Sequence, residues 1–135
     1  MSMQSSLDCP AKLTGKRVLV VEDEALVSMM VEDELLDAGA EVVGPAACIG
    51  DALRLIEAAA ADGGLSAAVL DINLEGRHVA PVADRLAALG VPFLFATAYG
   101  KGCDTGGHGA APNLSKPFDP ERLMVAVEAL ASAKA

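Results

Sequence analysis

The sequence predicts an α/β fold, a doubly wound parallel sheet of five strands, on three observations. For the strand order we expect 2-1-3-4-5, a common order in sheets of this class. Short, continuous apolar runs recur along the chain, which is typical of strands buried on both faces. Segments with apolar residues at helical spacing alternate with these runs, and this alternation favours a parallel sheet covered by helices. The length of 135 residues, 53% of them hydrophobic, allows one domain with a full core.

The first half of the chain contains two predicted strands and two predicted helices. Gly39 lies where a helix C-cap belongs, after the first helical segment. Gly44-Pro45 is expected to end the second strand, and Asp51 is expected to cap the second helix. The predicted elements are a strand at 17–21, a helix at 25–38, a strand at 41–43 and a helix at 51–61.

The second half repeats this alternation. Pro81 fits the first turn of a helix that Gly90 stops, and Asp119 caps the last helix with Pro120 at its first position. The predicted elements are a strand at 67–71, a helix at 81–89, a strand at 91–97, a short strand at 114–115 and a final helix from 120 through 130.

One segment interrupts the pattern where a fourth helix is due, between Tyr99 and Pro112. Five of the twelve residues from Gly100 to Ala111 are glycine. They would cost a helix roughly 4–5 kcal/mol relative to alanine. We therefore predict a loop there, or at most one helical turn.

The charge and composition exclude several classes of partner. Ten Lys and Arg stand against 19 Asp and Glu, giving a net charge of −9. This charge repels nucleic-acid phosphates and anionic membrane surfaces. Aromatic residues make up only 3% and Trp is absent, which disfavours base-stacking platforms. We predict no nucleic-acid partner and no membrane partner.

The cysteines and the amino-terminal segment indicate the compartment. Cys9, Cys48 and Cys103 form no closely spaced pair, which is typical of reduced thiols in a cytosol. No apolar run reaches membrane-spanning length, and residues 1–15 lack the apolar core of a secretion signal. We predict a disordered tail at 1–15, a folded domain at 16–135 and a cytoplasmic location.

Polar side chains follow the predicted strands at their carboxyl ends, where open α/β sheets bind ligands. Glu22 and Asp23 follow the first strand, Asp71 ends the third, Thr97 ends the fourth and Lys116 follows the fifth. Three converging carboxylates require a cation or a raised pKa, and such an oxygen-only set suits Mg²⁺. A carboxylate beside a metal, an ammonium and a hydroxyl can attack a phosphoryl group, and Asp71 is the best placed to do so.

These residues, in this order and spacing, resemble the receiver domain of two-component response regulators, a family with a flavodoxin-like fold. The motifs that carry the resemblance are Glu22-Asp23-Glu24, Asp71, Thr97 and Lys116-Pro117-Phe118, and it extends from about Lys16 to Ala133. Residues 92–100 are similar to a stand-alone subgroup with a Phe-Ala-Thr-Gly-Tyr-like motif. The resemblance implies a single-domain response regulator, a signalling switch rather than an enzyme.

The resemblance also implies roles for individual residues. Asp71 would accept a phosphoryl group from a histidine kinase or a histidine phosphotransferase, and Thr97 and Lys116 would contact that group. Mg²⁺ would be bound by Glu22, Asp23, Asp71 and the backbone carbonyl of Asn73. The family's aromatic switch position is Asn113 here, so Tyr99 is expected to take the switch role together with Thr97. Output would pass to a downstream protein or along a phosphorelay. Glu24 is interpreted as a helix-start acid outside the site.

Two alternatives share parts of this pattern. A small phosphatase or phosphotransferase of haloacid-dehalogenase-like chemistry would also use an aspartyl phosphate. It requires an aspartate two residues after the nucleophile, where this chain has Asn73. A flavodoxin-like flavin carrier would need a Ser/Thr-rich phosphate loop after the first strand, where this chain has three acids.

Overall fold

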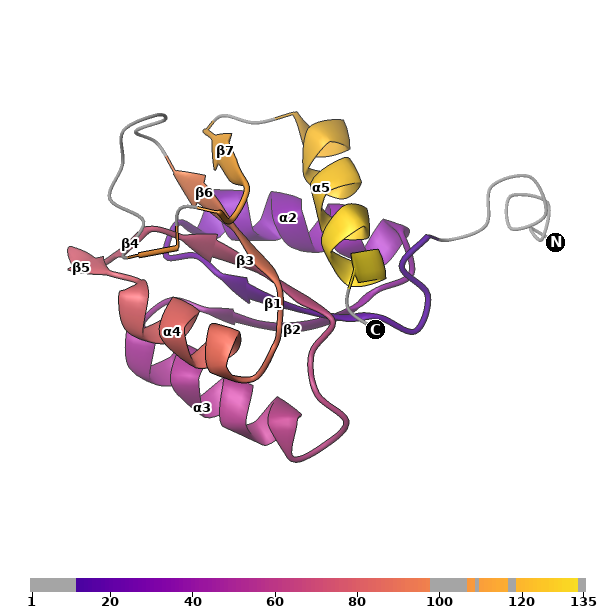
Figure 1. Ribbon diagram of the computed structural model, residues 1–135. Helices are drawn as coiled ribbons and strands as arrows, with labels where there is room; N and C mark the ends of the chain where they lie inside the picture. Colours follow the sequence, from indigo (N-terminus) through magenta and orange to yellow (C-terminus); the bar gives the residue numbers. More distant parts are fainter. Residues whose placement is uncertain (1–11, 98–106, 109, 117–118, 134–135) are drawn as a thin grey trace, which may run out of the picture.

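The computed structural model describes residues 12–97, 107–108, 110–116 and 119–133. Strands and helices alternate along the chain as predicted, with one additional hairpin (Figure 1). The strands are β1 (Arg17–Val21), β2 (Glu41–Ala46), β3 (Ala67–Asp71), β4 (Asn73–Leu74), β5 (Arg77–His78), β6 (Phe93–Thr97) and β7 (Asn113–Ser115). The helices are α2 (Ala25–Asp37), α3 (Ile49–Ala60), α4 (Ala80–Ala88) and α5 (Pro120–Ala133).

Five parallel strands form the main sheet in the order β2-β1-β3-β6-β7. Counted without the hairpin strands, this is the predicted order 2-1-3-4-5, and the doubly wound α/β class is confirmed. Strand β1 lies between β2 and β3, with Val21 opposite Leu70. Strand β3 in turn pairs with β6, with Asp71 opposite Ala96. The carboxyl ends of β1, β3 and β6 therefore lie next to one another.

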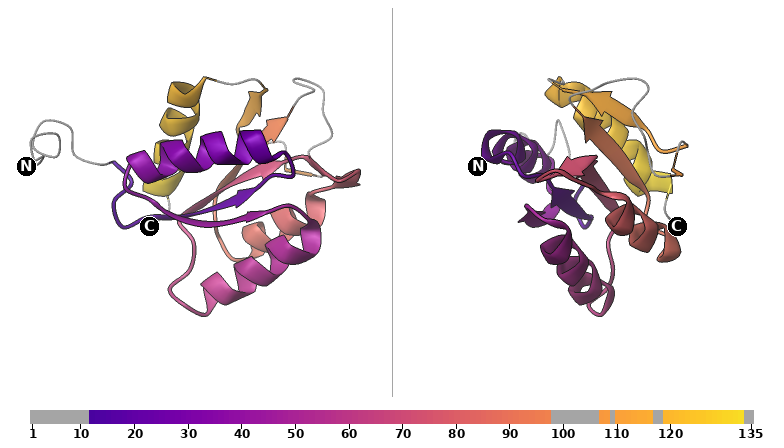
Figure 2. Two further views of the ribbon diagram at one scale, coloured as in Figure 1. Left: turned by 180° about the vertical axis from the view of Figure 1, so that it is seen from behind. Right: turned by 90° about the vertical axis from the view of Figure 1, so that its left-hand side faces the viewer.

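Helices cover both faces of this sheet (Figures 1 and 2). Helices α2 and α5 pack on one face, and α3 and α4 pack on the other. Alternate residues of β1 enter the two cores: Val18 and Val20 face α2 and α5, whereas Leu19 and Val21 face α3 and α4. All four side chains are fully buried. This two-sided burial explains why the strand reads as a continuous apolar run.

Strand β2 is longer than predicted, because it continues through Gly44-Pro45 to Ala46. The strand lies at the edge of the sheet, where a proline's missing N–H removes no ladder hydrogen bond. Gly44 has a φ of +99°, and an added Cβ would lie 2.8 Å from the Val20 carbonyl oxygen. Only glycine fits this close approach, so Gly44 permits the strand that it was predicted to end.

Two further elements begin two residues away from their predicted starts. Helix α3 begins at Ile49, after Cys48, and Asp51 lies in its first turn instead of capping it. A carboxylate in that position still favours the positive end of the helix dipole. Strand β6 begins at Phe93, after Pro92.

The hairpin of β4 and β5 was not predicted from the sequence. Asn73 pairs with His78 and Leu74 with Arg77, around a two-residue turn. Both turn residues have positive φ, +51° at Glu75 and +82° at Gly76, as a type I′ hairpin turn requires. The hairpin follows directly after Asp71 and so lies beside the predicted site.

The remaining predictions concern the segments around this core. Residues 107–108 and 110–112, between β6 and β7, contain no helix, whereas 98–106 lie outside the described residues. Within the predicted tail, Leu13 is buried and its N–H donates to the Ala38 carbonyl oxygen. Leu13 therefore packs with the folded domain, and the boundary between residues 15 and 16 stays a prediction.

None of the helices in the described part of the chain has the length and apolar character needed to cross a bilayer.

Candidate phosphoacceptor site

Three carboxylates meet at the carboxyl ends of β1 and β3. Glu22 and Asp23 follow β1, and Asp71 is the last residue of β3. One carboxylate oxygen from each lies within 4.8 Å of the other two. The parallel pairing of β1 with β3 causes this convergence, because it aligns Val21 with Leu70 and so places Glu22 beside Asp71. The sequence prediction brought the same three residues together.

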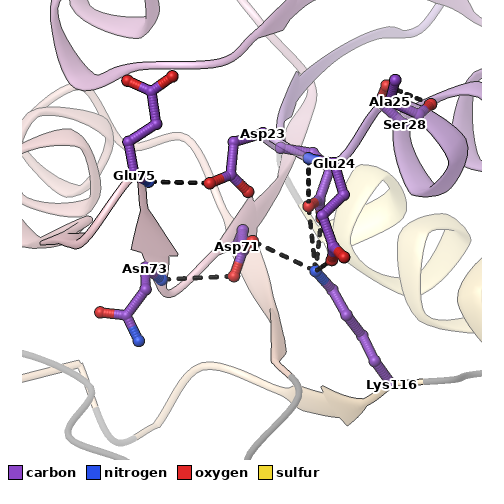
Figure 3. A network of polar contacts seen from close by, with 9 residues as sticks. Asp23, Glu24, Ala25, Ser28, Asp71, Asn73, Glu75 and Lys116 are labelled. Carbon is purple, nitrogen blue, oxygen red and sulfur yellow. Dashed lines mark hydrogen bonds and ion pairs between the residues drawn. The ribbon is translucent and has the colours of Figure 1, made fainter.

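Lys116 reaches the same point from the end of β7 (Figure 3). Its backbone N–H donates to the Thr97 carbonyl oxygen at 2.7 Å, which fixes the start of the side chain. The ammonium Nζ lies 2.9 Å from Glu22 Oε1, 3.1 Å from Glu24 Oε1 and 3.2 Å from Asp71 Oδ2. One cation therefore contacts carboxylates that precede it in the sequence by 45 to 94 residues.

The charges in this cluster are largely removed from solvent. The side chains of Glu22, Asp71 and Lys116 are 5%, 11% and 11% exposed. Burial raises the pKa of Glu22 to about 7, although hydrogen bonds from Lys116 and from the Glu24 N–H act in the opposite direction. Burial also raises the pKa of Asp71, against the lowering effect of Lys116. Burial alone would lower the pKa of Lys116, but the carboxylates of Glu22 and Asp71 raise it overall.

The β4–β5 hairpin orients two of the carboxylates through backbone N–H groups. The Glu75 N–H donates to Asp23 Oδ2 at 2.8 Å, and the Asn73 N–H donates to Asp71 Oδ1 at 3.3 Å (Figure 3). Such fixed donors hold the carboxylate planes in one orientation. A metal-ligand role for the Asn73 carbonyl stays a prediction.

Thr97 ends β6, one residue beyond the partner of Asp71. Its side chain is buried, and it does not line the cleft that opens above the carboxylates. Its predicted contact with a phosphoryl group stays a prediction. The predicted switch residue Tyr99 lies outside the described residues, as do Pro117 and Phe118. Asn113, at the family's usual aromatic position, is exposed at the start of β7.

A cleft of about 500 Å³ opens over these groups. Its lining consists of Asp23, Glu24, Asp71, Asn73, Glu75, Gly76 and Lys116. Glu24, interpreted from the sequence as a residue outside the site, lines this cleft, and its carboxylate accepts a hydrogen bond from Lys116. The run of three acids after β1 was the sequence pattern that could have placed Glu24 in the site. No local pattern indicated Glu75, which reaches the cleft because it lies in the turn between β4 and β5.

The arrangement suits a small divalent cation and an anionic group together. Carboxylate oxygens are the ligands that Mg²⁺ prefers, and Glu22, Asp23 and Asp71 bring three carboxylates together, two of which also contact the Lys116 ammonium. Four carboxylates, those of Glu22, Asp23, Glu24 and Asp71, stand against the single ammonium of Lys116, so negative charge is left for a cation to offset. The donor set therefore fits Mg²⁺.

Solved structures show the family to which this site belongs. SdrG from Sphingomonas melonis Fr1 is 40% identical, with a TM-score of 0.72, over 88% of this chain and 97% of that chain. The BeF3-activated conformation of SdrG from Pseudomonas melonis Fr1 is 39% identical, with a TM-score of 0.69, over 85% and 95%. The response regulator PhyR from Brucella abortus is 27% identical, with a TM-score of 0.68, over 96% of this chain and 52% of that one.

No family model matches the chain, and no curated protein matches it. The fold and the cluster of acids with a lysine at the strand ends, together with the likeness to SdrG, define the class of receiver domains. With 40% identity to SdrG over nearly the whole length of that protein, the chain belongs to the response regulator receiver domain family. The predicted family is confirmed, whereas the Phe-Ala-Thr-Gly-Tyr-like subgroup stays a prediction.

Proposed function

We propose that this chain is a phosphoacceptor switch in which Asp71 receives a phosphoryl group from the phosphohistidine of a kinase or a phosphotransferase. One observation carries the proposal. Asp71 ends a buried strand with Lys116 Nζ 3.2 Å from its Oδ2 and two further carboxylates beside it. A buried carboxylate next to a fixed ammonium is arranged to take up an anionic group at that point. The membership of the receiver domain family supports this proposal.

The transfer itself is a displacement at phosphorus. An oxygen of the ionised Asp71 carboxylate forms the new O–P bond, and the P–N bond of the phosphohistidine breaks. The electron pair leaves with the ring nitrogen, and an imidazole protonated at its other nitrogen leaves neutral. Lys116 is placed to interact with the phosphoryl oxygens, because its ammonium already lies beside Asp71.

Glu22, Asp23 and Asp71 would hold Mg²⁺, with the Asn73 backbone carbonyl as a further oxygen ligand. When bound, Mg²⁺ neutralises charge on the phosphoryl oxygens and on the carboxylates. The chain's own residues prepare this role: the Glu75 N–H orients Asp23, and the Asn73 N–H orients Asp71.

The signal would leave the domain through a change of conformation. Thr97 and Lys116 are joined through the backbone bond at the ends of β6 and β7, so both would respond to a phosphoryl group on Asp71, with Tyr99 as the further switch residue. We propose output by binding a downstream protein, or by passing the phosphoryl group along a relay, in the cytoplasm. The BeF3-activated conformation of SdrG supports a two-state switch of this kind.

The test is uptake of a phosphoryl group from acetyl phosphate in the presence of Mg²⁺, read as the added mass of the intact protein. The wild type should gain one phosphoryl mass, and Asp71→Asn should gain none. Asp51→Asn, in the first turn of α3, is the matched control and should be modified like the wild type. An adduct that persists in Asp71→Asn, or that forms equally after removal of Mg²⁺ with EDTA, contradicts the proposal.

The same assay separates a switch from a phosphatase. A switch takes up one phosphoryl group per chain and releases it slowly, whereas a phosphatase releases phosphate from small esters over many turnovers. Asn73 stands where the phosphatase chemistry needs a carboxylic acid, and an amide cannot act as a general acid or base.

A further inference from the structure

Glu24 makes a contact that neither its place in the chain nor the proposed chemistry requires. It stands at the N-cap of α2, where short polar side chains bond the free N–H groups of the helix, and the Glu24 side chain makes no such capping bond. Its carboxylate instead lies 3.1 Å from Lys116 Nζ. The reach of this side chain toward the cleft is visible in Figure 3.

This contact completes the set of acceptors around the Lys116 ammonium. An ammonium has three N–H donors. The Nζ group donates to Glu22 Oε2, Glu24 Oε1 and Asp71 Oδ2 at 3.1 Å, 3.1 Å and 3.2 Å, with Glu22 Oε1 also near at 2.9 Å. A phosphoryl group on Asp71 brings new oxygens to the same ammonium, so one of the three contacts has to give way.

The three contacts differ in how easily they can be released. The carboxylates of Glu22 and Asp71 are held among buried groups, whereas the Glu24 side chain is 63% exposed. Water can solvate the Glu24 carboxylate when it leaves Lys116, and this makes its release the least costly.

From this geometry we infer that Glu24 is a positioning residue that competes with the phosphoryl group for Lys116. In the unphosphorylated protein the Glu24 carboxylate holds the ammonium toward the start of α2. Phosphorylation of Asp71 replaces that carboxylate with phosphoryl oxygens. The inference rests on the proposed function, since it concerns the same transfer to Asp71. Glu24 acts only through Lys116 and takes no part in bond making.

The test compares phosphorylation rates with acetyl phosphate and Mg²⁺ at 150 mM salt in three variants. In this transfer the donor's P–O bond breaks, acetate leaves with the electron pair, and a new O–P bond forms at Asp71. Glu24→Gln removes the competing charge and should raise the rate constant about two- to fivefold. Glu24→Asp keeps the charge but shortens the side chain by one methylene, so the rate constant should also rise, by about twofold.

Glu75→Gln is the control that removes a carboxylate charge from the cleft without changing a contact with Lys116. Glu75 also lines the cleft, but its side chain points away from Lys116 in Figure 3, and its backbone N–H to Asp23 is kept in the variant. Removing this charge reduces only the general repulsion of the anionic donor, which salt at this concentration partly screens, so the rate constant should rise less in Glu75→Gln than in Glu24→Gln. A rise common to Glu24→Gln and Glu75→Gln, with Glu24→Asp unchanged, would mean general repulsion of the anionic donor and overturns the inference.

A second measurement needs no phosphoryl group. In the unphosphorylated wild type, the Lys116 ammonium should exchange its protons more slowly with water, by ¹⁵N NMR, than in Glu24→Gln, while Glu75→Gln leaves it unchanged. Equal exchange in all three proteins overturns the inference. If the wild type takes up no phosphoryl group, the proposed function fails and the inference fails with it. If the wild type is modified but Glu24→Gln is no faster, the inference alone fails.

Discussion

Lys116 and Arg17 lie at opposite ends of the parallel strands, and each holds distant segments together. Arg17 begins β1 and donates to the carbonyl oxygens of Asp62 and Gly64 at 2.5 Å and 3.1 Å. Its ion-pair partners, Glu41 and Asp62, are mainly exposed. Lys116 instead contacts two carboxylates that are themselves buried, those of Glu22 and Asp71.

The two clusters differ in the balance of buried charge. At Arg17 the partners are neutral carbonyl groups and solvated acids, so nothing charged is left without compensation. At Lys116 the carboxylates outnumber the ammonium, and burial raises the pKa of both Glu22 and Asp71. Buried carboxylates without an equal number of cations destabilise the fold, and such groups are typical of sites that bind a ligand or carry out a reaction. We therefore expect the Arg17 cluster to matter for stability alone and the Lys116 cluster for both stability and signalling.

Lys116→Met tests the comparison most strongly. Without its ammonium, the buried carboxylates repel one another with no compensating charge, so the free energy of unfolding should fall by about 3 kcal/mol at pH 7.5 without Mg²⁺. Urea denaturation followed by circular dichroism measures this. Lys12→Met is the control, since Lys12 is exposed and lies 3.9 Å from Glu128, and it should cost less than about 0.5 kcal/mol. Equal losses in the two variants would contradict the assigned role of Lys116.

The raised pKa of Glu22 predicts how Mg²⁺ binding depends on pH. The folded-state pKa is about 7, above the ordinary 4.5. Mg²⁺ needs the ionised carboxylate, so its affinity should be roughly a hundredfold weaker at pH 5 than at pH 8. In the metal-free protein the same shift stabilises the fold below pH 4.5, and this contribution is lost as the pH rises through about 7. Titration calorimetry and thermal melts check both effects. Glu22→Gln should weaken Mg²⁺ binding and flatten the pH dependence of metal-free stability.

The sequence predicts those parts of the fold and of the Lys116 cluster that leave a pattern among neighbouring residues. The strand cores were predictable because two-sided burial leaves continuous apolar runs, and Asp71 was predictable because a lone acid ends such a run. The hairpin was not, since β4 and β5 have two residues each and no periodicity. The Glu24 contact spans 92 residues and depends on the reach of two flexible side chains, which no local pattern encodes.

Arg17→Met tests the contribution of the Arg17 cluster, at the opposite end of the strands, to stability. The variant loses two hydrogen bonds to backbone carbonyls that tie the segment after α3 to β1, so the free energy of unfolding should fall by about 2 kcal/mol. The rate of phosphorylation by acetyl phosphate should not change. Arg54→Met, which removes an exposed pair with Asp51, is the control and should cost less than about 0.5 kcal/mol. A slower phosphorylation in Arg17→Met would show that the two clusters are coupled.

Asp71→Asn should have the smallest effect on stability and the opposite sign. Replacing one buried carboxylate by a neutral amide relieves repulsion with Glu22, while Lys116 keeps the contacts with Glu22 and Glu24. The free energy of unfolding should therefore rise by about 1 kcal/mol in metal-free buffer at pH 7.5. Saturating Mg²⁺ should shrink this gain, because the cation stabilises the wild type through a ligand that the variant lacks. Asp51→Asn, which removes an exposed carboxylate from α3, should give no gain. If Asp71→Asn is instead less stable than the wild type without Mg²⁺, the Lys116 cluster holds no surplus of negative charge, and the contrast with Arg17 disappears.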